Sequence, residues 1–405
     1  MTLTSNIAII GAGCAGLTLA LTLHKRGIPC KVYEAAPGPR NVGGTLVLCP
    51  NGLKILDELG VYQDILSRGR EDAVMEFRRV PGLELVDTVE LGNTAKYGYN
   101  SVRVLRRHVM DVLLGALIAR GITVHYKKRF ARVLLETHEA VAWLFDDGTT
   151  GRATTALVGA DGIHSRLRAH LHPDVALEFT HVFATTAIVP ASQVCLPLGT
   201  NLPVTLMSNT QGAYVLVYAD AAETQICVMK QARKADLGRD GWAAFVADTE
   251  GVVAFLREGA ENFPAYVQRA VAAVPVDTLI VWPFHVVPQL RTWSSTLRKI
   301  TLLGDAAHAL PPSTGQGANQ VLEDAFTYGT VLAQSTAETL ADNLLKWHAG
   351  RQARVDGILK IAKKMNARRL PQVEGQPATF VPGDLTYDWV FDVDYEKLVS
   401  TWLAR

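Results

Sequence analysis

The sequence predicts a mixed α/β (α+β) fold in which one domain is assembled from separated segments of the chain. Three glycine-containing stretches, at residues 11–16, 159–162 and 304–319, each follow a short apolar run of the kind that forms a buried strand. Between them, many segments alternate apolar and polar residues, as antiparallel strands do. We expect residues 1–70, 100–176 and 290–370 to form the nucleotide-binding domain, residues 71–99 and 177–289 an inserted antiparallel-sheet domain, and residues 371–405 a C-terminal helical tail.

The first stretch, Gly11-Ala-Gly13-Cys-Ala15-Gly16, has the form and the context of a dinucleotide fingerprint. It follows the apolar run 7–10 and opens a helix-patterned segment, 17–25. In such a Rossmann-like turn the first glycine permits the tight turn, the second lets the backbone approach a pyrophosphate, and the third lets the helix pack on the strand. The helix N-terminus adds free N–H groups and the positive end of its dipole, so we expect phosphates here.

Glu34 ends the second expected strand, Cys30–Tyr33, at the position where an acid accepts hydrogen bonds from an adenosine ribose, about 20 residues after the glycines. A carboxylate at this place repels a 2′-phosphate, which argues against NADP as the ligand of this fingerprint. The alternative is a glycine-rich turn in some other α/β protein, with a surface glutamate at a strand end.

The middle of the chain reads mostly as strands. Alternation predicts strands at 74–80 and 83–89, a helix over 107–120, and a meander of strands at 123–126, 131–135 and 140–145 that leads into the run 156–161. From 177 to 282 the pattern is again mostly strand, with helices expected near 242–258 and 266–273.

The third stretch combines Gly304-Asp305 with the loop that runs from Pro312 through Gly315, Gly317 and Ala318 to Asn319. It follows the apolar run 300–303, and a long helix is expected over 319–341. A loop followed by a helix aims backbone N–H groups and a positive dipole end at one spot. For Gly304-Asp305 alone, a strand followed by a capping aspartate is the alternative.

Composition and charge exclude several functions. The chain has 405 residues and a formal net charge of +1, so there is no electrostatic footprint for nucleic acid or an acidic membrane. Basic clusters at 127–129 and 360–369 are interpreted as solvated faces. No apolar run is long enough to span a bilayer.

The five cysteines are odd in number, widely spaced and without a CxxC pair, which argues against a disulfide framework and against zinc. His170 and His172 lack acidic partners in the sequence and are interpreted as a surface turn, so no metal site is expected. We expect a cytoplasmic protein, monomeric or homodimeric.

With all three motifs in this order, the chain resembles the class A flavoprotein monooxygenases, the aromatic hydroxylase family typified by para-hydroxybenzoate and salicylate hydroxylases. The resemblance covers residues 6–335. It implies FAD as the cofactor, with Asp161 in a middle motif that serves both FAD and the nicotinamide cofactor. It also implies that Asp305 holds the ribityl or ribose region, and that Gly44 and Thr45 run beside the isoalloxazine.

An arginine that contacts FAD in this family opens a helix with the pattern Arg-x-x-Leu-x-x-x-Leu. Arg107 matches it, with Met110 in place of the first leucine, and Arg106 is the neighbouring possibility. A guanidinium suits the role because it forks onto phosphate or ribose oxygens. The alternative is a surface arginine at a helix start.

The resemblance implies a monooxygenase that hydroxylates an aromatic or other electron-rich small molecule, in a setting such as secondary metabolism. NADH or NADPH reduces the FAD, and O2 then gives a C4a-hydroperoxyflavin that must be kept from water. No second Rossmann fingerprint is found, so the reductant is expected to bind transiently. The alternatives are a flavin epoxidase of a terpenoid-like substrate and a non-catalytic accessory protein that binds FAD and a ligand; a flavin halogenase is disfavoured because no Trp-x-Trp-x-Ile-Pro stretch is present.

In the inserted domain, no catalytic side chain is assigned. Tyr218 is the one candidate for a catalytic residue, and Tyr214 is the alternative for the same role. The segment 387–395 is interpreted as packing. We further expect one elongated cavity, with Glu34 and the turn from Pro312 at opposite ends. The residues expected to be compatible with an apolar substrate wall are Val204, Leu206, Met207, Tyr214, Leu216 and Tyr218.

Overall fold

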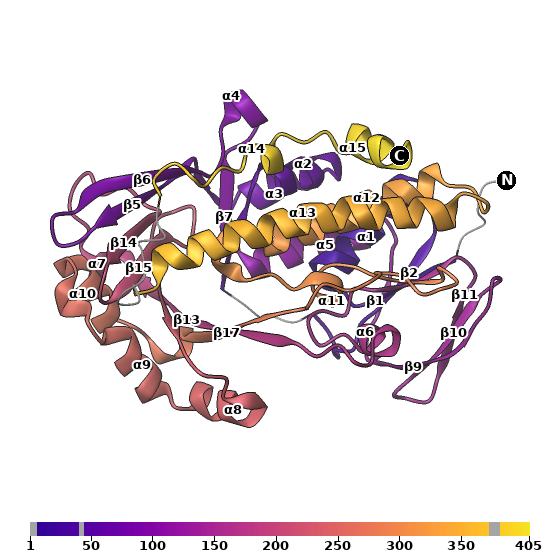
Figure 1. Ribbon diagram of the computed structural model, residues 1–405, viewed down its shortest axis with the longest axis horizontal. Coiled ribbons are helices and arrows are strands. Elements are labelled where there is room, and N and C mark those ends of the chain that lie inside the picture. Colours follow the sequence, from indigo (N-terminus) through magenta and orange to yellow (C-terminus); the bar gives the residue numbers. More distant parts are fainter. Residues whose placement is uncertain (1–5, 40–43, 372–380) are drawn as a thin grey trace.

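The computed structural model describes residues 6–39, 44–371 and 381–405, and a five-stranded parallel sheet lies at the centre of one half (Figure 1). Its order is β18 (Ile300–Leu302), β12 (Ala156–Gly159), β1 (Ile7–Ile10), β2 (Cys30–Tyr33) and β8 (Val124–His125). All neighbouring pairs are parallel. Because the carboxyl ends of parallel strands share one edge, the three glycine-containing stretches meet there, as the ends of β1, β12 and β18.

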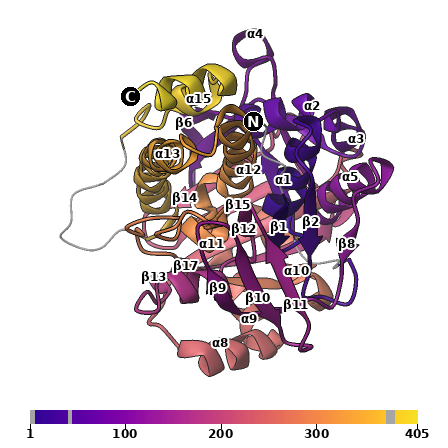
Figure 2. The same cartoon turned by 90° about the vertical axis from the view of Figure 1, so that its right-hand side faces the viewer.

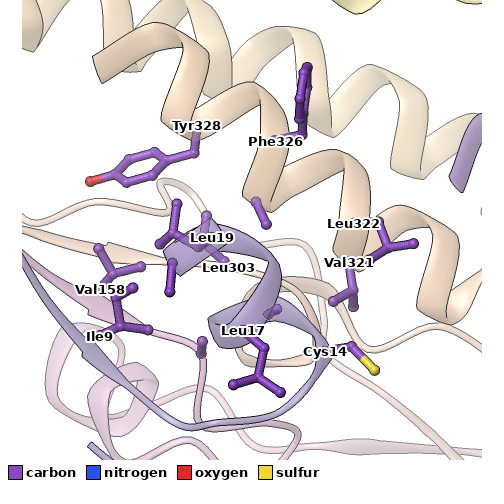
Figure 3. Packing of buried hydrophobic residues seen from close by; sticks show 14 of the residues in the cluster. Ile9, Cys14, Leu17, Leu19, Val158, Leu303, Val321, Leu322, Phe326 and Tyr328 are labelled. Carbon is purple, nitrogen blue, oxygen red and sulfur yellow. The ribbon is translucent and has the colours of Figure 1, made fainter. Parts of the chain in front are cut away.

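Helix α1 (Cys14–Lys25) covers one face of this sheet, and two further helices pack against this helix. These two helices are α12 (Gly317–Gln334) and α5 (Arg106–Ala119). Figure 3 shows buried side chains from β1, β12, α1 and α12 gathered between the strands and the helices. Burial of each such aliphatic side chain stabilises the fold by about 1.5–3 kcal/mol.

A seven-stranded sheet forms the other half of the molecule (Figure 1). Strands β14 and β5 pair in parallel and the other neighbours are antiparallel, so residues 74–90 and 178–286 build one sheet from two separate segments. The strands, in sheet order, are β17 (Ile280–Val286), β13 (Glu178–Pro190), β16 (Gln225–Arg233), β15 (Gly212–Tyr218), β14 (Val204–Ser208), β5 (Val74–Arg79) and β6 (Glu84–Glu90).

Short helices pack on the far side of this sheet from the cavity described below. Buried residues of β14, β15 and β16 form one cluster with Leu256 and Val267. These helices are α7 (Ala191–Val194), α8 (Gly238–Ala247), α9 (Thr249–Arg257) and α10 (Ala265–Ala272), with 3₁₀ turns at Ala260–Asn262 and Val276–Thr278.

Two small antiparallel sheets complete the strands of the described residues. The remaining elements are β3 (Thr45–Leu48), β7 (Ser101–Leu105) and β4 (Arg70–Asp72) in one sheet, β9 (Phe130–Glu136), β10 (Val141–Phe145) and β11 (Thr150–Ala153) in the other, and the helices α2 (Pro50–Glu58), α3 (Tyr62–Leu66), α4 (Thr94–Tyr97), α6 (Arg166–Leu171) and α11 (Asp305–His308).

The single long helix expected over 319–341 is two helices. Helix α12 ends at Gln334, and α13 (Leu340–Arg369) begins after a turn in which the side chains of Thr336 and Thr339 bond each other's backbone N–H groups. Such local side-chain bonds compete with helix continuation. Helix α13 then runs from the parallel-sheet half to the seven-stranded sheet (Figure 1).

The C-terminal segment is helical, as expected, with α14 (Asp388–Phe391) and α15 (Tyr395–Leu403). Figure 2 shows α15 beside α12 and α13, and residue contacts agree. The mixed α/β fold class is therefore confirmed, while the exact domain boundaries stay a prediction.

A buried network of charges fixes α13 on α12. The Arg351 side chain is fully buried and pairs with Glu323 and with Asp324, the latter at 2.7 Å from Nε to Oδ1. Arg354 Nε lies 2.7 Å from Glu323 Oε2, and His308 Nε2 lies 2.6 Å from Asp324 Oδ2. Each buried charge thus has an opposite partner, which is the condition for tolerating charge in a core.

Candidate functional site

A cavity of about 330 Å³ lies between the glycine-rich edge of the parallel sheet and one face of the seven-stranded sheet. All three sequence motifs contribute to its wall. Predicted site residues found in the wall are Gly13, Ala15, Gly44, Thr45, Asp305, Pro312, Gly315, Gly317 and Ala318. Those found outside the wall are Gly11, Gly16, Glu34, Arg107, Asp161, Asn319 and Tyr218.

Two helix N-termini form the polar part of the wall. Helices α1 and α12 have 12 and 18 residues, and their N-cap residues, Gly13 and Gln316, make no side-chain capping bond. Residues of both first turns, among them Ala15 and Ala318, line the cavity. Their backbone N–H groups and positive dipole ends suit phosphate or another anionic group.

The structure shows why glycine stands at three positions of the first motif. Gly11 has φ +107°, and a Cβ there would lie 2.2 Å from the Ala160 oxygen; a Cβ on Gly16 would lie 1.9 Å from the Gly11 oxygen. These two positions pack strand, turn and helix together. A Cβ on Gly13 would meet nothing within 4 Å, so this position leaves open space beside the cavity, which fits the close approach of a pyrophosphate.

Glu34 stands behind the first motif. Its carboxylate accepts hydrogen bonds from the backbone N–H of Ala12 at 2.9 Å and of Ala36 at 2.8 Å. The cavity wall reaches Gly13 and the turn from Pro312 but does not include Glu34. The expectation that Glu34 would mark one end of the cavity is therefore not met, because its oxygens face the glycine turn.

The middle motif is tied to the third. Asp161 accepts the backbone N–H of Arg166, the first residue of α6, at 2.9 Å, while its neighbours Ala160 and Gly162 line the wall. Burial raises the pKa of Asp161. Arg168 donates to the backbone oxygen of Ala306 over 3.1 Å, which joins the ends of β12 and β18.

Asp305 is exposed to the cavity, but many protein atoms lie close around its carboxyl group and keep water away from it. Burial raises the pKa of this carboxyl, and the nearby His308 and Arg106 oppose the rise. The loop that follows is held by Asn319, whose side chain accepts the Cys49 N–H at 2.9 Å and donates to the Gly315 oxygen at 2.8 Å. Asn319 thus supports the wall from behind.

The arginine at the start of α5 differs from the expectation. Arg106 lines the cavity, whereas Arg107 is exposed and outside it. The two neighbours lie about 100° apart around the helix, so only one can face the cavity. Arg103, on β7, also lines the cavity and pairs with Asp72 at 3.2 Å.

The apolar wall is one face of the seven-stranded sheet. On four adjacent strands, residues two apart line it, as the pleat of a strand requires. These pairs are Ala184 and Thr186, Val215 and Val217, Cys227 and Met229, and Ile280 and Trp282. Trp282 is also 44% exposed, so the cavity opens to solvent beside β17.

The substrate-wall residues expected from sequence lie elsewhere, none of them in the cavity wall. Tyr214 donates to the Leu256 backbone oxygen and packs against the helices on the far face. Tyr218 has the Arg70 guanidinium 4.6 Å from its ring centroid. Both tyrosines are one residue out of step with Val215 and Val217, which places them on the opposite face. The expectation of a catalytic tyrosine therefore finds no support in the cavity geometry.

One end of the cavity was missed by sequence reasoning. Arg369, at the end of α13, is 3% exposed and lines the wall together with Tyr387 and Phe391. The basic cluster at 360–369 is thus only partly a solvated face, because its lysines are exposed and its two arginines are buried. The buried stripe Ile358, Ile361, Met365, Arg369, at steps of three and four, is the signal that could have found it.

The described residues hold neither a metal-ligand cluster nor a membrane-spanning helix, and their cysteines are unpaired. No three His, Cys, Asp or Glu side chains within these residues are grouped as metal ligands would be. Among them, no helix contains an apolar stretch of the length that spanning a bilayer requires. All five cysteines are free thiols.

Comparisons with known proteins agree with this geometry. A family model described as FAD binding domain matches residues 4–362. The chain is 30% identical to a 3-amino-4-hydroxybenzoate 2-monooxygenase of Streptomyces platensis, over 80% of this chain and 79% of that protein. It is 26% identical to a 6-hydroxynicotinate 3-monooxygenase of Bordetella bronchiseptica, over 88% and 90%.

Solved structures share the fold. The Klebsiella pneumoniae HpxO complex with FAD and uric acid superposes with a TM-score of 0.77 at 21% identity, covering 100% of this chain and 98% of that one. A salicylate hydroxylase substrate complex gives a TM-score of 0.78 at 22% identity, covering 98% of each chain.

Proposed function

Since the chain belongs to the FAD-binding-domain family of flavin-dependent aromatic hydroxylases, we propose that it inserts one oxygen atom of O2 into a small aromatic substrate at the expense of NADH or NADPH. The protein is a flavoprotein monooxygenase, and FAD is its cofactor. The bound flavin supplies electron transfer from the nicotinamide and activation of oxygen.

A single observation carries the proposal: one cavity has a polar wall made of two helix N-termini and an apolar wall made of a sheet face. The polar wall fits the parts of FAD that carry negative charge. The apolar wall, in which Thr186 is the polar member of the four strand pairs, offers an aromatic ring a largely apolar surface and keeps water from it.

We assign the cofactor contacts by place in the wall. The first turn of α1, from Gly13 to Ala15, and the Arg106 guanidinium would hold the pyrophosphate side. Asp305 would accept hydrogen bonds from ribityl hydroxyls. The first turn of α12, at Gly317 and Ala318, would face the flavin ring, where reduced flavin is anionic, and Gly44 and Thr45 would lie along the ring.

Gly11, Gly16, Glu34, Asp161 and Asn319 would act from behind the wall, by fixing the turns that present these groups. We place entry of substrate and reductant beside Trp282, where the cavity opens. The five free thiols support a reducing, cytoplasmic setting.

The test is turnover by the purified protein with a panel of phenols and hydroxylated aromatic acids. We expect a yellow protein in which one panel member accelerates both NAD(P)H oxidation and oxygen uptake, with one atom from ¹⁸O₂ in the product. Bound FAD that neither nicotinamide reduces would contradict the proposal and favour an accessory protein. An epoxide from a terpenoid-like substrate would instead favour the epoxidase alternative.

A matched pair of variants tests the cofactor assignment. Gly13→Leu places a side chain into the open space beside the cavity, so we expect a folded protein that has lost its FAD. Gly115→Leu is the control, because Gly115 on α5 also has nothing within 4 Å of its Cβ position and is exposed, far from the wall. Retained FAD in the Gly13 variant would overturn the assignment.

A further inference from the structure

The end of the cavity formed by α13 and the C-terminal segment holds a cation without an anionic partner. Arg369 Nη1 donates to the Ser313 backbone oxygen at 3.1 Å, and Nη2 lies 3.5 Å from Met75 Sδ. The buried Nε has no hydrogen-bond partner within the described part of the chain. The guanidinium therefore makes one good hydrogen bond and one weak one.

Other buried arginines are compensated. Arg351 and Arg354 pair with Glu323, and Arg103 pairs with Asp72. Arg368, the direct neighbour, pairs with Asp87 and Asp384. Arg168 donates to three backbone oxygens. In the ranges that the structure describes, Arg369 has no acidic group within ion-pair distance.

The surroundings of Arg369 increase this imbalance. Burial lowers its pKa to about 10; Tyr387 opposes this, and the charges of Arg103 and Arg368 add to it. The group stays cationic at neutral pH. Tyr387 adds no negative charge to this end: burial raises the pKa of its phenol, and its hydroxyl lies 3.4 Å from the Thr314 backbone oxygen. A buried charge without a counter-ion is energetically unfavourable, and a bound anion offsets that cost.

On the basis of the function proposed above, we propose that Arg369, with Tyr387 beside it, is an anion-binding subsite for an acidic oxygen of the aromatic substrate. The substrate ring would lie against the apolar sheet face, and its carboxylate or phenolate would reach the Arg369 end. The substrate class is then an acidic aromatic compound, and Arg369 determines specificity for the charge.

The experiment compares binding of charged and uncharged isosteres to the FAD-loaded protein. The probes are pairs of an aromatic acid and its carboxamide, such as salicylate and salicylamide or indole-3-carboxylate and its amide. A second set, nitrophenols titrated across their own pKa, separates phenolate from carboxylate recognition. Binding is measured by equilibrium dialysis and by perturbation of the flavin absorbance, both independent of turnover.

In the wild-type protein we expect at least one anion to bind 10-fold or more tightly than its neutral partner. Arg369→Met should reduce that preference to less than threefold, and Arg369→Lys should keep part of it, because the charge remains but the planar fork is lost. Arg233→Met is the control: Arg233 is exposed, bonds the Pro371 backbone oxygen, and should leave the preference unchanged.

The proposal is overturned if no anion is preferred by the wild-type protein, or if Arg369→Met keeps the preference. The wild-type comparison decides the matter even if the Met variant fails to fold. Failure here is distinct from failure of the proposed function, because amides that stimulate oxygen uptake as well as acids would refute the subsite and leave the hydroxylase intact.

Discussion

The carboxylate of Glu34 accepts a hydrogen bond from the backbone N–H of Ala12, with 2.9 Å between the two atoms, and so links the end of β2 to the glycine turn that follows β1. The other carboxylate oxygen accepts the N–H of Ala36. The turn that presents Gly13 to the cavity is therefore held by a charged side chain from the neighbouring strand.

Glu34→Gln should weaken FAD binding about 10-fold while leaving the protein folded. The amide keeps one acceptor, but its NH2 group faces a backbone donor, and a hydrogen bond to a charged group is worth about 1.5–3 kcal/mol. Titration of the apoprotein with FAD measures the affinity. Glu58→Gln, at a solvent-exposed ion pair with Lys25, is the control. Equal FAD affinities in the wild-type protein and both variants would refute the role of Glu34.

Arg106→Met should raise the FAD dissociation constant by about 10-fold or more, since charge-assisted bonds are among the strongest that a side chain makes. Arg107→Met should not change it, because that side chain is exposed outside the wall. Flavin fluorescence on release distinguishes the two variants. The reverse result would return the role to Arg107.

Stability should depend on pH through the buried network of α12 and α13. Burial alone would raise the pKa of Glu323, but the guanidinium groups of Arg354 and Arg351 lower it to about 2, from an ordinary value of 4.5. A carboxylate with a lowered pKa contributes stability that is complete above its unfolded pKa and is lost as the pH falls through its folded pKa. The window is therefore pH 4.5 to 2.

Glu323→Gln should lower the free energy of unfolding by about 3–5 kcal/mol at pH 7, because two buried guanidinium groups lose their partner. Its deficit relative to wild type should shrink as the pH falls through that window, as denaturant titrations at several pH values would show. Glu396→Gln, whose side chain is 55% exposed in its pair with Arg26, should change stability by less than about 1 kcal/mol. A deficit that is constant with pH would contradict the account.

Phe391→Leu should uncouple oxygen reduction from hydroxylation. The ring is buried, lines the cavity and stacks on Tyr387 with a centroid distance of 5.2 Å, so the smaller side chain opens that end to water. We expect a larger share of NAD(P)H oxidation to yield hydrogen peroxide, measured with a peroxidase assay. Trp389→Leu, on the same short helix but 41% exposed and outside the wall, should stay coupled; if both variants uncouple equally, the cause is loss of α14.

Sequence could predict the parallel sheet and its glycine turns because local chemistry determines them. A buried strand, a turn that needs Gly11 and a helix start lie within 20 residues, and the family resemblance depends on such local patterns. The fold class followed from the three glycine-containing stretches and the alternating segments between them, and the cofactor followed from the family resemblance that the stretches carry.

The substrate face could not be predicted in this way. Strand β15 is buried at six of its seven positions, so both faces are apolar and alternation carries no information on which one meets the cavity. For this reason the sequence predicts Tyr214 and Tyr218 as substrate-wall residues, whereas Val215 and Val217 line the cavity. Arg369 was missed because exposed lysines precede it in sequence, at 360, 363 and 364, and its burial depends on contacts with strands far away along the chain.

The dispersal of the cavity wall along the chain has a consequence for biosynthesis. Its polar parts come from the ends of β1, β12 and β18, and its last walls from Tyr387 and Phe391. A nascent polypeptide on the ribosome therefore cannot retain its flavin when the N-terminal fingerprint emerges, and loading must wait until nearly the whole chain has been translated.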